Sequence, residues 1–478
     1  MDQRRMPLVE QLITYKNTAP VSYHVPGHKN GTVFQEEAHR LFNDVLSIDV
    51  TEIKGMDDLH HPEGVIGDAE QLAADLYGAE HTSFLVGGST AGNLAMIVGS
   101  FSVNDIVLVQ RNSHQSVFHG LEVSGARPVF IEPVIDNETG MLLGADLNAV
   151  NDALKLYPEA KGLILTSPTY EGYVQPLELI IKKAHEAGVM VMVDEAHGAH
   201  LIEVQRDWPA SSLKAGADVV VQSAHKMLPA MTMTAFLHMQ GSRVDKAAVK
   251  RHLRMFQSSS PSYPLMASLD AARAYLAAFL PDRYERLYKK ATDFRKKLGT
   301  IPQWDIAPLK IAEFLQDPLK IVLISRSTAT GLMLQDSLSS HGIYPELAND
   351  NYLVLTLPLS LEWCDTVEKI REAVSHYPII REKECIAIEA LREPVTELSF
   401  SYKEMASKET CFHDVQDAAG QVAAEDVVPY PPGIPLIMNG ERIKPRQLER
   451  LKELIESGAS FQTGTAWLHK GLKVYKKD

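Results

Sequence analysis

Cysteine is scarce in this chain. Its 478 residues contain three, Cys364, Cys385 and Cys411, all in the last quarter. Their spacing matches no metal-binding motif, and an odd number argues against a disulfide framework. We therefore expect reduced thiols, as in a cytoplasmic protein. The sequence also lacks an apolar run of about 18 residues and an apolar N-terminal stretch of signal-peptide length, so neither a membrane-spanning helix nor a secretory signal is expected.

Positive charge is also in deficit. Lysine and arginine number 47 against 61 aspartates and glutamates, which gives a formal net charge of −14. This balance disfavours nucleic acid as a partner and leaves a small molecule as the expected one. Repeats and low-complexity segments are absent as well. The composition, 45% hydrophobic and 23% charged, is that of an ordinary globular protein, long enough for two or three domains of roughly 100–200 residues each.

From about residue 65 the sequence alternates regularly between helix-like and strand-like segments. The strand-like segments are short apolar runs, such as GLILT and VMVMV, which are typical of strands buried on both faces of a largely parallel sheet. This alternation indicates an α/β fold, in which ligands bind beyond the carboxyl ends of the strands. We predict strands at 82–86, 105–109, 128–131, 162–166, 189–193, 218–222 and 234–238, and helices at 66–77, 92–101, 114–123, 147–156 and 177–187.

Four parts are expected along the chain. Residues 1–50 form an N-terminal arm with one helix at 35–46, and residues 51–265 form the large domain. Residues 266–379 begin within a long helical stretch, which runs from about 264 to 299, and continue as a small α/β domain. In this domain residues 319–375 are expected to form the strand KIVLIS, the helix GLMLQDSLSSHG, the strand YLVLTL and a further helix. Residues 380–478 form a C-terminal α+β domain with an amphipathic helix near 445–457.

Two polar residues follow apolar strands and are candidates for chemistry. Lys226, in SAHKMLPAMT, comes shortly after the strand DVVVQ, and Asp194 follows VMVMV directly. A deprotonated lysine can bond covalently to an aldehyde, and a carboxylate can pair with a protonated ring nitrogen. Each has a simpler alternative, because Lys226 alone could be a surface residue and Asp194 alone could be a helix N-cap.

A third candidate is the segment VGGSTAGN at 86–93, between a strand and a helix. Its glycines allow close approach of the backbone to an anion, and Ser89, Thr90 and the Ala91 N–H add donors, so it suits a phosphate group. It has neither a Walker lysine nor a GxGxxG pattern, which disfavours nucleotide binding. His114, in RNSHQS, could stack on a ring or could be an ordinary surface histidine. The pairs His24/His28 and His197/His200 could suggest a metal site, but HGAH lacks the i,i+4 spacing of HExxH and no cysteine or third ligand is paired with it, so no metal is expected.

Together these stretches resemble the Orn/Lys/Arg decarboxylase family, and in particular its short Bacillus-type arginine or lysine decarboxylases. The resemblance covers nearly the whole chain. The matching stretches are HVPGHKNG (24–31), TEIKGMDDLHHPEG (51–64), VGGSTAGN (86–93), RNSHQS (111–116), SPTYEG (167–172), VDEAHGAH (193–200), SAHKMLPAMT (223–232), SSSPSYPLMASLDAAR (258–273) and YPPGIPLIMNGE (430–441).

The resemblance implies a fold-type-I enzyme that depends on pyridoxal 5'-phosphate (PLP), with an aspartate-aminotransferase-like large domain and a mostly parallel seven-stranded sheet. Lys226 would form the Schiff base, Asp194 would pair with the pyridine nitrogen, and His114 would stack on the ring. His197 and His225 would flank the cofactor, and Ser89, Thr90, Ala91 and Ser223 would hold its phosphate. Ser258 and Ser259 would reach the phosphate of the neighbouring subunit in a homodimer with shared sites.

The expected reaction is decarboxylation of a basic L-amino acid in polyamine metabolism, with arginine, lysine and ornithine left open. The alternatives are another fold-type-I reaction, such as that of an aminotransferase or lyase, or a non-catalytic homologue. Residues 1–23 precede HVPGHKNG, so the wing domain of larger members and its decamers are not expected. For the distal cation of the substrate, the candidate partners are Glu171, Glu425 and Asp426.

Overall fold

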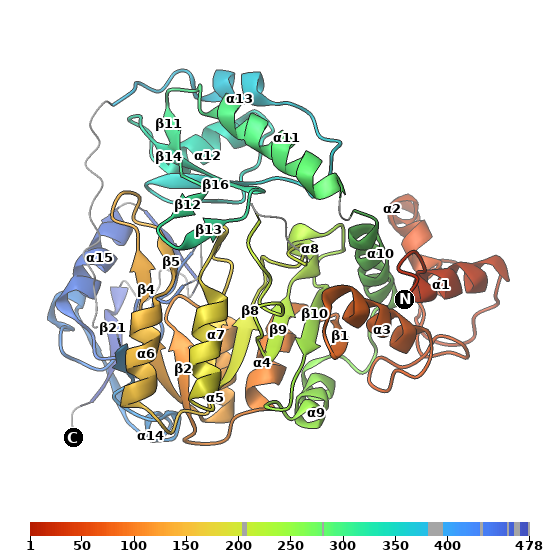
Figure 1. The fold of residues 1–478 in the computed structure, drawn as a ribbon, viewed down its shortest axis with the longest axis horizontal. Helices are drawn as coiled ribbons and strands as arrows, with labels where there is room; N and C mark the ends of the chain where they lie inside the picture. The colour runs from red at the N-terminus through yellow and green to blue at the C-terminus, as the bar shows by residue number, and fades with distance from the viewer. Residues whose placement is uncertain are drawn as a thin grey trace. The chain divides into compact units, whose positions relative to one another are not determined.

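The computed structural model describes residues 1–202, 208–279, 282–380, 395–430, 434–456, 458–462 and 469–476. The chain forms two compact units (Figure 1). Unit 1 comprises residues 1–100, 192–205 and 210–285, and unit 2 comprises residues 101–191, 206–209 and 286–478. Cys385 lies outside the described residues, whereas Cys364 and Cys411 are free thiols. None of the described helices is long and apolar enough to span a membrane.

Unit 1 is built on the strand order β1-β10-β9-β8. Strands β8 and β9 run parallel, whereas β10 pairs antiparallel with both β9 and β1. These strands are almost wholly buried, in agreement with their apolar sequences. The strands are β1 (His81–Leu85), β8 (Met190–Asp194), β9 (Val219–Gln222) and β10 (Ala235–Met239), and the helices are α1 (Pro7–Asn17), α2 (Glu36–Leu46), α3 (Val65–Tyr77), α4 (Gly88–Val98), α8 (Ala224–Met227), α9 (Lys246–Phe256) and α10 (Tyr263–Phe279).

Helix α4 begins at Gly88, four residues earlier than the sequence predicted. The segment expected to be a loop is therefore the first turn of the helix. A Cβ on Gly92 would lie 2.7 Å from Leu85 Cδ1 and 2.9 Å from Val221 Cγ1. Gly92 thus lets α4 pack closely against β1 and β9, and its role is packing rather than anion binding.

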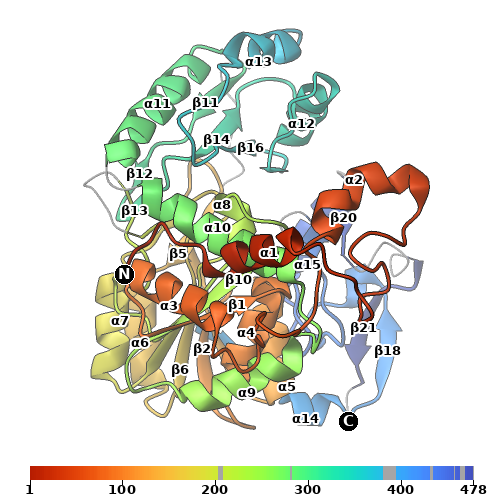
Figure 2. The same ribbon diagram turned by 90° about the vertical axis from the view of Figure 1, so that its right-hand side faces the viewer.

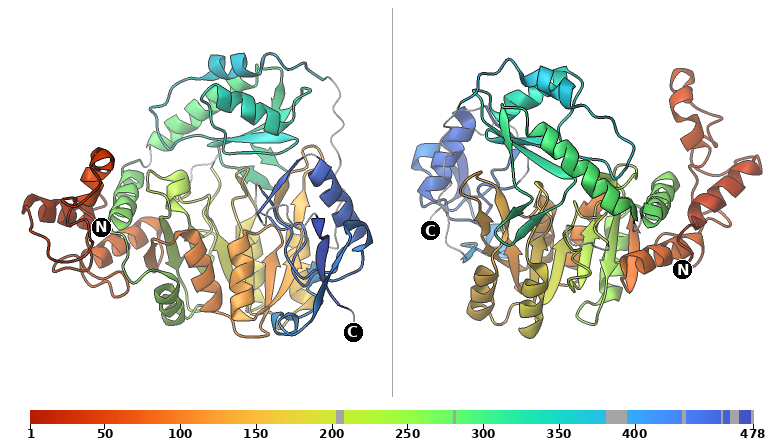
Figure 3. Two further views of the ribbon diagram at one scale, coloured as in Figure 1. Left: turned by 180° about the vertical axis from the view of Figure 1, so that it is seen from behind. Right: turned by 45° about the horizontal axis from the view of Figure 1, so that its top comes forward.

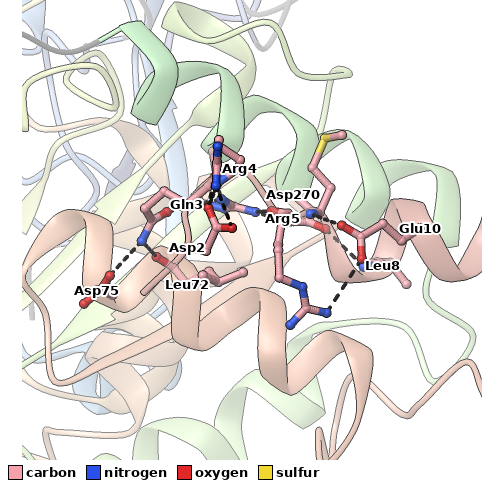
Figure 4. Close-up of polar contacts among 11 residues, drawn as sticks. Asp2, Gln3, Arg4, Arg5, Leu8, Glu10, Leu72, Asp75 and Asp270 are labelled. Atoms are coloured by element: carbon pink, nitrogen blue, oxygen red, sulfur yellow. Dashed lines mark hydrogen bonds and ion pairs between the residues drawn. The ribbon is translucent and has the colours of Figure 1, made fainter.

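The N-terminal arm contains a helix that the sequence did not predict, α1, which contacts α3 and α10 (Figure 2). The buried ion pair of Arg273 and Asp270 on α10 fastens the segment before α1. The Arg273 guanidinium donates to the carbonyls of Gln3 and Arg5. Asp270 accepts from the Leu8 N–H at 3.1 Å (Figure 4). The motif residues Asp270 and Arg273 are therefore structural.

Asp57, in the motif KGMDDLHHPEG, is structural too. Its carboxylate accepts hydrogen bonds from five backbone N–H groups around the start of α3. Burial raises the pKa of Asp57, but these hydrogen bonds outweigh burial and leave the pKa below its ordinary value. Gly64 is the N-cap residue of α3, and the Asp57 carboxylate accepts from N–H groups of the first helical turn as an N-cap side chain would.

Unit 2 carries the strand order β6-β2-β3-β17, in which β2 runs parallel to β6 and β3 and β17 runs antiparallel to β3. All seven strands predicted for the large sheet are present in the two units. β17 comes from the C-terminal part and was not predicted. This part of unit 2 contains β2 (Ile106–Gln110), α5 (Gln115–Ser124), β3 (Arg127–Ile131), β4 (Pro133–Ile135), β5 (Leu142–Ala145), α6 (Leu147–Leu156), β6 (Gly162–Thr166), β7 (Tyr173–Val174), α7 (Leu177–Glu186) and β17 (Val395–Glu397).

The remainder of unit 2 holds a four-stranded antiparallel sheet, β11-β14-β16-β15, with helices α11, α12 and α13 gathered around it (Figure 2). The four elements predicted between residues 319 and 375 are all present. The elements are α11 (Asp282–Leu298), β11 (Trp304–Ile306), β12 (Lys310–Ile311), β13 (Phe314–Gln316), β14 (Lys320–Ser325), α12 (Gly331–Ser340), β15 (Leu347–Ala348), β16 (Tyr352–Thr356) and α13 (Val367–Val374). The predicted helical stretch at 264–299 is α10 followed by α11.

The C-terminal part, drawn in blue in Figure 3, has its own apolar cluster. In this cluster Leu448 and Leu451 of α15 join Val474 of β21. The amphipathic helix predicted near 445–457 is α15, and residue 457 lies outside the described residues, as do residues 431–433 of the YPPGIP turn. The elements are α14 (Tyr402–Met405), β18 (Thr410–His413), η1 (Val415–Asp417), β19 (Pro429–Tyr430), α15 (Pro445–Glu456), β20 (Ser460–Phe461) and β21 (Leu472–Tyr475).

Candidate functional site

Lys226 and His197 form a close pair in unit 1. Lys226 lies in the short helix α8, which follows β9, and His197 lies in the turn after β8. The Lys226 Nζ atom is 3.1 Å from His197 Nε2. The His197 side chain is buried and that of Lys226 is partly buried. At this distance the amine and the imidazole can share a proton, so the imidazole can take a proton from the amine or return one.

Asp194 is the last residue of β8 and is 2% exposed. Its Oδ2 atom accepts a hydrogen bond from Asn93 Nδ2 at 2.9 Å, and its Oδ1 atom accepts one from the Ala196 N–H at 3.2 Å. These two bonds fix the orientation of the carboxylate. Asn93 was not predicted as a site residue, although it ends the motif VGGSTAGN, and a buried amide on an otherwise apolar helix face is the signal that could have identified it.

Two serine hydroxyls meet at the first turn of α4. Ser89 Oγ lies 2.8 Å from Ser223 Oγ, which precedes α8 and is fully buried. Ser89 and Thr90 occupy helix positions whose N–H groups have no acceptor within the helix, whereas Ala91 lies one residue further in. Thr90 is exposed. Gly88 has φ of 71°, and a Cβ there would meet no atom within 4 Å, so space is open at this turn for an anion.

Behind Asp194 lies a buried polar network centred on Glu195. One Glu195 oxygen accepts from the Ser212 N–H and hydroxyl at 2.7 and 2.6 Å, and the other accepts from Gln222 Nε2 at 2.6 Å. Gln222 Oε1 accepts in turn from His238 Nε2 at 3.1 Å. Burial raises the pKa of Glu195 to about 7 although these donors lower it. The network ties the segment after β8 to β9 and β10, and so helps to position Asp194.

The other predicted cofactor residues have structural partners of their own. His225 Nδ1 donates to the Thr234 carbonyl at 2.9 Å. The carbonyl of Ser258 accepts from His60 Nε2 at 2.9 Å, and both Ser258 and Ser259 are exposed. In unit 2, His114 is the N-cap of α5, and its Nδ1 accepts from the Ser116 N–H at 3.2 Å. This capping hydrogen bond fixes the imidazole ring of His114. Stacking of the ring on a cofactor stays a prediction.

The three acidic candidates for a distal cation differ in their surroundings, and all lie in unit 2. Glu171 is 7% exposed and lines a cavity of about 390 Å³. Neither Glu425 nor Asp426 is among the residues that line this cavity. Asp426 Oδ1 accepts from the Asn439 N–H at 2.7 Å, and burial raises the pKa of Asp426. Asp426 therefore has a structural role in this turn.

The donor set of unit 1 fits PLP. An amine suits its aldehyde, a buried carboxylate suits its pyridine nitrogen, and the open helix start at Gly88 with two serine hydroxyls suits its phosphate. When bound, PLP supplies an electrophilic carbon for an amine and a ring that accepts the electron pair of a broken bond. Lys226, Asp194, Ser89 and Ser223 are the residues that would hold it.

Comparison with known proteins gives a consistent picture. The model of the Orn/Lys/Arg decarboxylase major domain matches residues 6–313, and that of the C-terminal domain of the same family matches residues 382–462. The chain is 42% identical to the uncharacterized protein YaaO of Bacillus subtilis, with 98% of each chain covered. It is 33% identical to the arginine decarboxylase of Bacillus subtilis, with 97% of this chain and 96% of the relative covered.

The fold has a close match among solved structures. The constitutive lysine decarboxylase of Escherichia coli matches with a TM-score of 0.80 at 19% identity, covering 100% of this chain and 82% of that one. At this identity the likeness shows the fold alone, which is the mixed α/β fold-type-I architecture that the sequence predicted.

Proposed function

Because this chain belongs to the Orn/Lys/Arg decarboxylase family of PLP-dependent amino-acid decarboxylases, we propose that it removes the α-carboxylate of a basic L-amino acid as CO2. The substrate class is arginine, lysine or ornithine, and the corresponding products are agmatine, cadaverine and putrescine. We propose further that the reaction serves polyamine metabolism and takes place in the cytoplasm.

The observation that carries this proposal is the grouping of Lys226, His197 and Asp194 at the carboxyl ends of two adjacent parallel strands, β8 and β9. A partly buried amine 3.1 Å from a buried imidazole can exchange a proton with it. A buried carboxylate held by two donors is suited to pairing with a protonated ring nitrogen. Both features are those that PLP chemistry requires of its protein.

In this proposal each residue has a definite task. Lys226 would hold the cofactor covalently between turnovers and would deliver a proton to the product carbon once released. His197 would hold the proton of Lys226 Nζ across the 3.1 Å contact. Asp194 would keep the ring nitrogen protonated and thereby strengthen the ring as an electron acceptor. Ser89 and Ser223 would bind the phosphate and orient the ring.

We also propose that the active enzyme is a homodimer with shared sites. Ser258 and Ser259 lie on an exposed turn, where they are accessible to a neighbouring subunit. The N-terminal arm exposes several large apolar side chains, which an association would bury: Val21, Tyr23, Val25, Leu41 and Phe42. Sedimentation analysis is expected to give a dimer or a multiple of it.

The experiment that tests the function is a substrate panel. Purified enzyme with PLP is incubated separately with L-arginine, L-lysine and L-ornithine, and released CO2 and the amine product are both measured. We expect one of the three to be turned over much faster than a neutral amino acid of similar length. Formation of a keto acid without CO2 would instead indicate an aminotransferase and contradict the proposal.

A further inference from the structure

The cavity of about 390 Å³ in unit 2 has the size of a small ligand site. It is formed by the segment after β2, the β4–β5 hairpin, the turn between β6 and β7, the start of α12, the segment from β15 to β16, and the C-terminal part around α15. Most of its lining is apolar, with Ile135, Leu142, Leu347, Leu436 and Leu454 among the contributors. Walls of this kind suit a short aliphatic chain.

Three acidic side chains line the cavity, Glu132, Glu171 and Asp350, and Glu171 is the buried one of the three. Its side chain is almost fully buried, and its Oε1 atom accepts a hydrogen bond from the Tyr352 hydroxyl at 2.6 Å. Burial, reinforced by the Glu171 charge, raises the pKa of Tyr352 well above its usual range. Tyr352 therefore remains a neutral donor, and it supplies no positive charge to the carboxylate.

The arginines that line the cavity are already paired with other acids. Arg111 donates to Glu441 Oε2 at 2.9 Å and to the Pro435 carbonyl at 2.9 Å. Arg450 donates to Glu453 Oε2 at 2.8 Å. In the part of unit 2 that the structure describes, both of these arginines thus form ion pairs with acids other than Glu171.

The turn that carries Glu171 is held firmly in place. The carbonyl of Glu171 accepts from Gln316 Nε2 at 2.8 Å. Gly172 has φ of 91°, and a Cβ there would lie 2.7 Å from the Lys320 side chain, so the turn packs directly on β14. The carboxylate is thus presented to the cavity by a backbone that has little freedom to move away.

A carboxylate that is removed from water without a counter-charge is costly, and a bound cation offsets this cost. We propose that the cavity binds a cation carried on a short aliphatic chain, with its ammonium or guanidinium group at Glu171 and its methylene groups against the apolar walls. Glu171 is then the residue that recognises charge, and Tyr352 is the residue that orients it.

Two molecules could supply this chemistry. One is the basic amino acid, whose distal group is such a cation on methylene groups, and Glu171 would then set the specificity of the reaction. The other is an amine product bound at a site of its own. The first source rests on the proposed decarboxylation, whereas binding of a cation at Glu171 does not, because it can be measured without turnover.

The test is calorimetric titration of the PLP-loaded enzyme with three probes of similar chain length. N,N-dimethylpentylamine is cationic and, as a tertiary amine, cannot condense with an aldehyde. Pentanol is neutral and pentanoate is anionic. We expect the cation to bind at least ~10-fold more tightly than the other two, as a charge-assisted hydrogen bond implies. Equal binding of cation and alcohol, or no binding of the cation, would overturn the proposal. This titration uses the wild-type enzyme, so its outcome does not depend on whether a variant folds.

Three variants locate the binding. Glu171→Gln is expected to remove the preference for the cation, and Tyr352→Phe is expected to keep it. The matched control is Glu313→Gln, which removes the same charge from an exposed position of unit 2 and is expected to bind as the wild type does. A cation preference that survives in Glu171→Gln would contradict the assignment to this cavity.

The source is then identified by steady-state kinetics with the preferred basic substrate. If the cavity holds the distal group of the substrate, the probe raises KM without changing kcat, and Glu171→Gln raises KM for the basic substrate alone. If the cavity is separate, the probe changes kcat or has no effect on KM. Failure of all three basic amino acids to react, with cation binding intact, would refute the proposed function and leave this site standing.

Discussion

The Nζ atom of Lys226 lies 3.1 Å from Nε2 of His197, although the two residues come from segments that follow different strands. One segment follows β8 and the other follows β9, and these strands are parallel neighbours. The carboxyl ends of parallel neighbours meet at one edge of a sheet, so the contact is a direct consequence of the topology. It brings an amine and a proton acceptor together where the fold places ligands.

Asp194→Asn is predicted to retain the fold and cofactor binding and to lose activity. The amide keeps the size of the carboxylate, and its one oxygen can still accept from the Ala196 N–H, whereas its NH2 group replaces the oxygen that accepts from Asn93. The amide also brings no negative charge to the ring nitrogen. Loss of one charge-assisted hydrogen bond costs roughly 1.5–3 kcal/mol, so kcat should fall by about 10–150-fold or more. Asn93→Ala is expected to give a smaller loss, since the charge remains. Wild-type turnover by Asp194→Asn would show that Asp194 has only a structural role.

Glu195→Gln is predicted to change how stability depends on pH. Burial raises the pKa of Glu195 from its ordinary value of 4.5 to about 7 in the folded protein. The folded protein therefore holds a proton that the unfolded chain releases, and the stability this provides is lost as pH rises from about 4.5 to about 7. The full effect is on the order of 3 kcal/mol.

Urea unfolding at pH 5, 6 and 7 tests this prediction. The free energy of unfolding of the wild type should fall over this range more steeply than that of Glu195→Gln, whose side chain does not titrate. Glu70, whose pKa burial raises to about 8, is present in both proteins and cancels in the comparison. Parallel curves for the two proteins would mean that Glu195 is ionised throughout.

Gly92→Ala is predicted to destabilise unit 1. The added methyl group would lie 2.7 Å from Leu85 Cδ1 and 2.9 Å from Val221 Cγ1, so α4 would have to move away from the sheet. Overpacking of this kind costs about 1–3 kcal/mol. Gly88→Ala is not a packing control, because its methyl group would enter the open space assigned to the phosphate and its φ is positive. Thermal unfolding without PLP should give a lower midpoint for Gly92→Ala than for the wild type, and an unchanged midpoint would contradict the packing role of Gly92.

Complementation tests whether the sites are shared. Lys226→Ala subunits and Ser258→Ala/Ser259→Ala subunits are each expected to be nearly inactive alone. A hybrid dimer would contain one intact site, so mixing equal amounts should restore up to about a quarter of wild-type activity for random exchange within a two-fold dimer. If mass spectrometry detects hybrids and activity is not restored, the serines do not act across the interface.

Some features of the site could be predicted from the sequence and others could not. The positions of Lys226 and Asp194 near the carboxyl edge of the sheet could be predicted, because each follows or ends an apolar strand-like segment. Asn93 and Gln222 could not, because their partners lie far away in the sequence and depend on how helices and strands pack. The start of α4 was placed too late because two consecutive glycines resemble a loop, whereas packing against β1 and β9 makes them part of a helix end.

The distal-cation candidates show the same limit. Glu171, Glu425 and Asp426 have the same charge and all lie near recognisable motifs, so the sequence cannot rank them. In the structure Asp426 is held by the Asn439 N–H, whereas Glu171 faces a cavity. Helix α1 was not predicted for a related reason. Its side chains Leu8 and Leu12 are buried by contacts with α3 and α10, which the local sequence does not reveal.

The central claim is that Lys226 is the covalent anchor of PLP, and borohydride reduction followed by peptide mapping tests it most directly. Wild-type enzyme loaded with PLP is reduced, digested and analysed by mass spectrometry, and Lys226→Ala is treated in parallel after circular dichroism has shown that it is folded. The account predicts that the phosphopyridoxyl group is found on Lys226 in the wild type and on no lysine at comparable yield in the variant. A phosphopyridoxyl group on a different lysine of the wild type, or a visible absorbance band in the variant that borohydride removes, would contradict it.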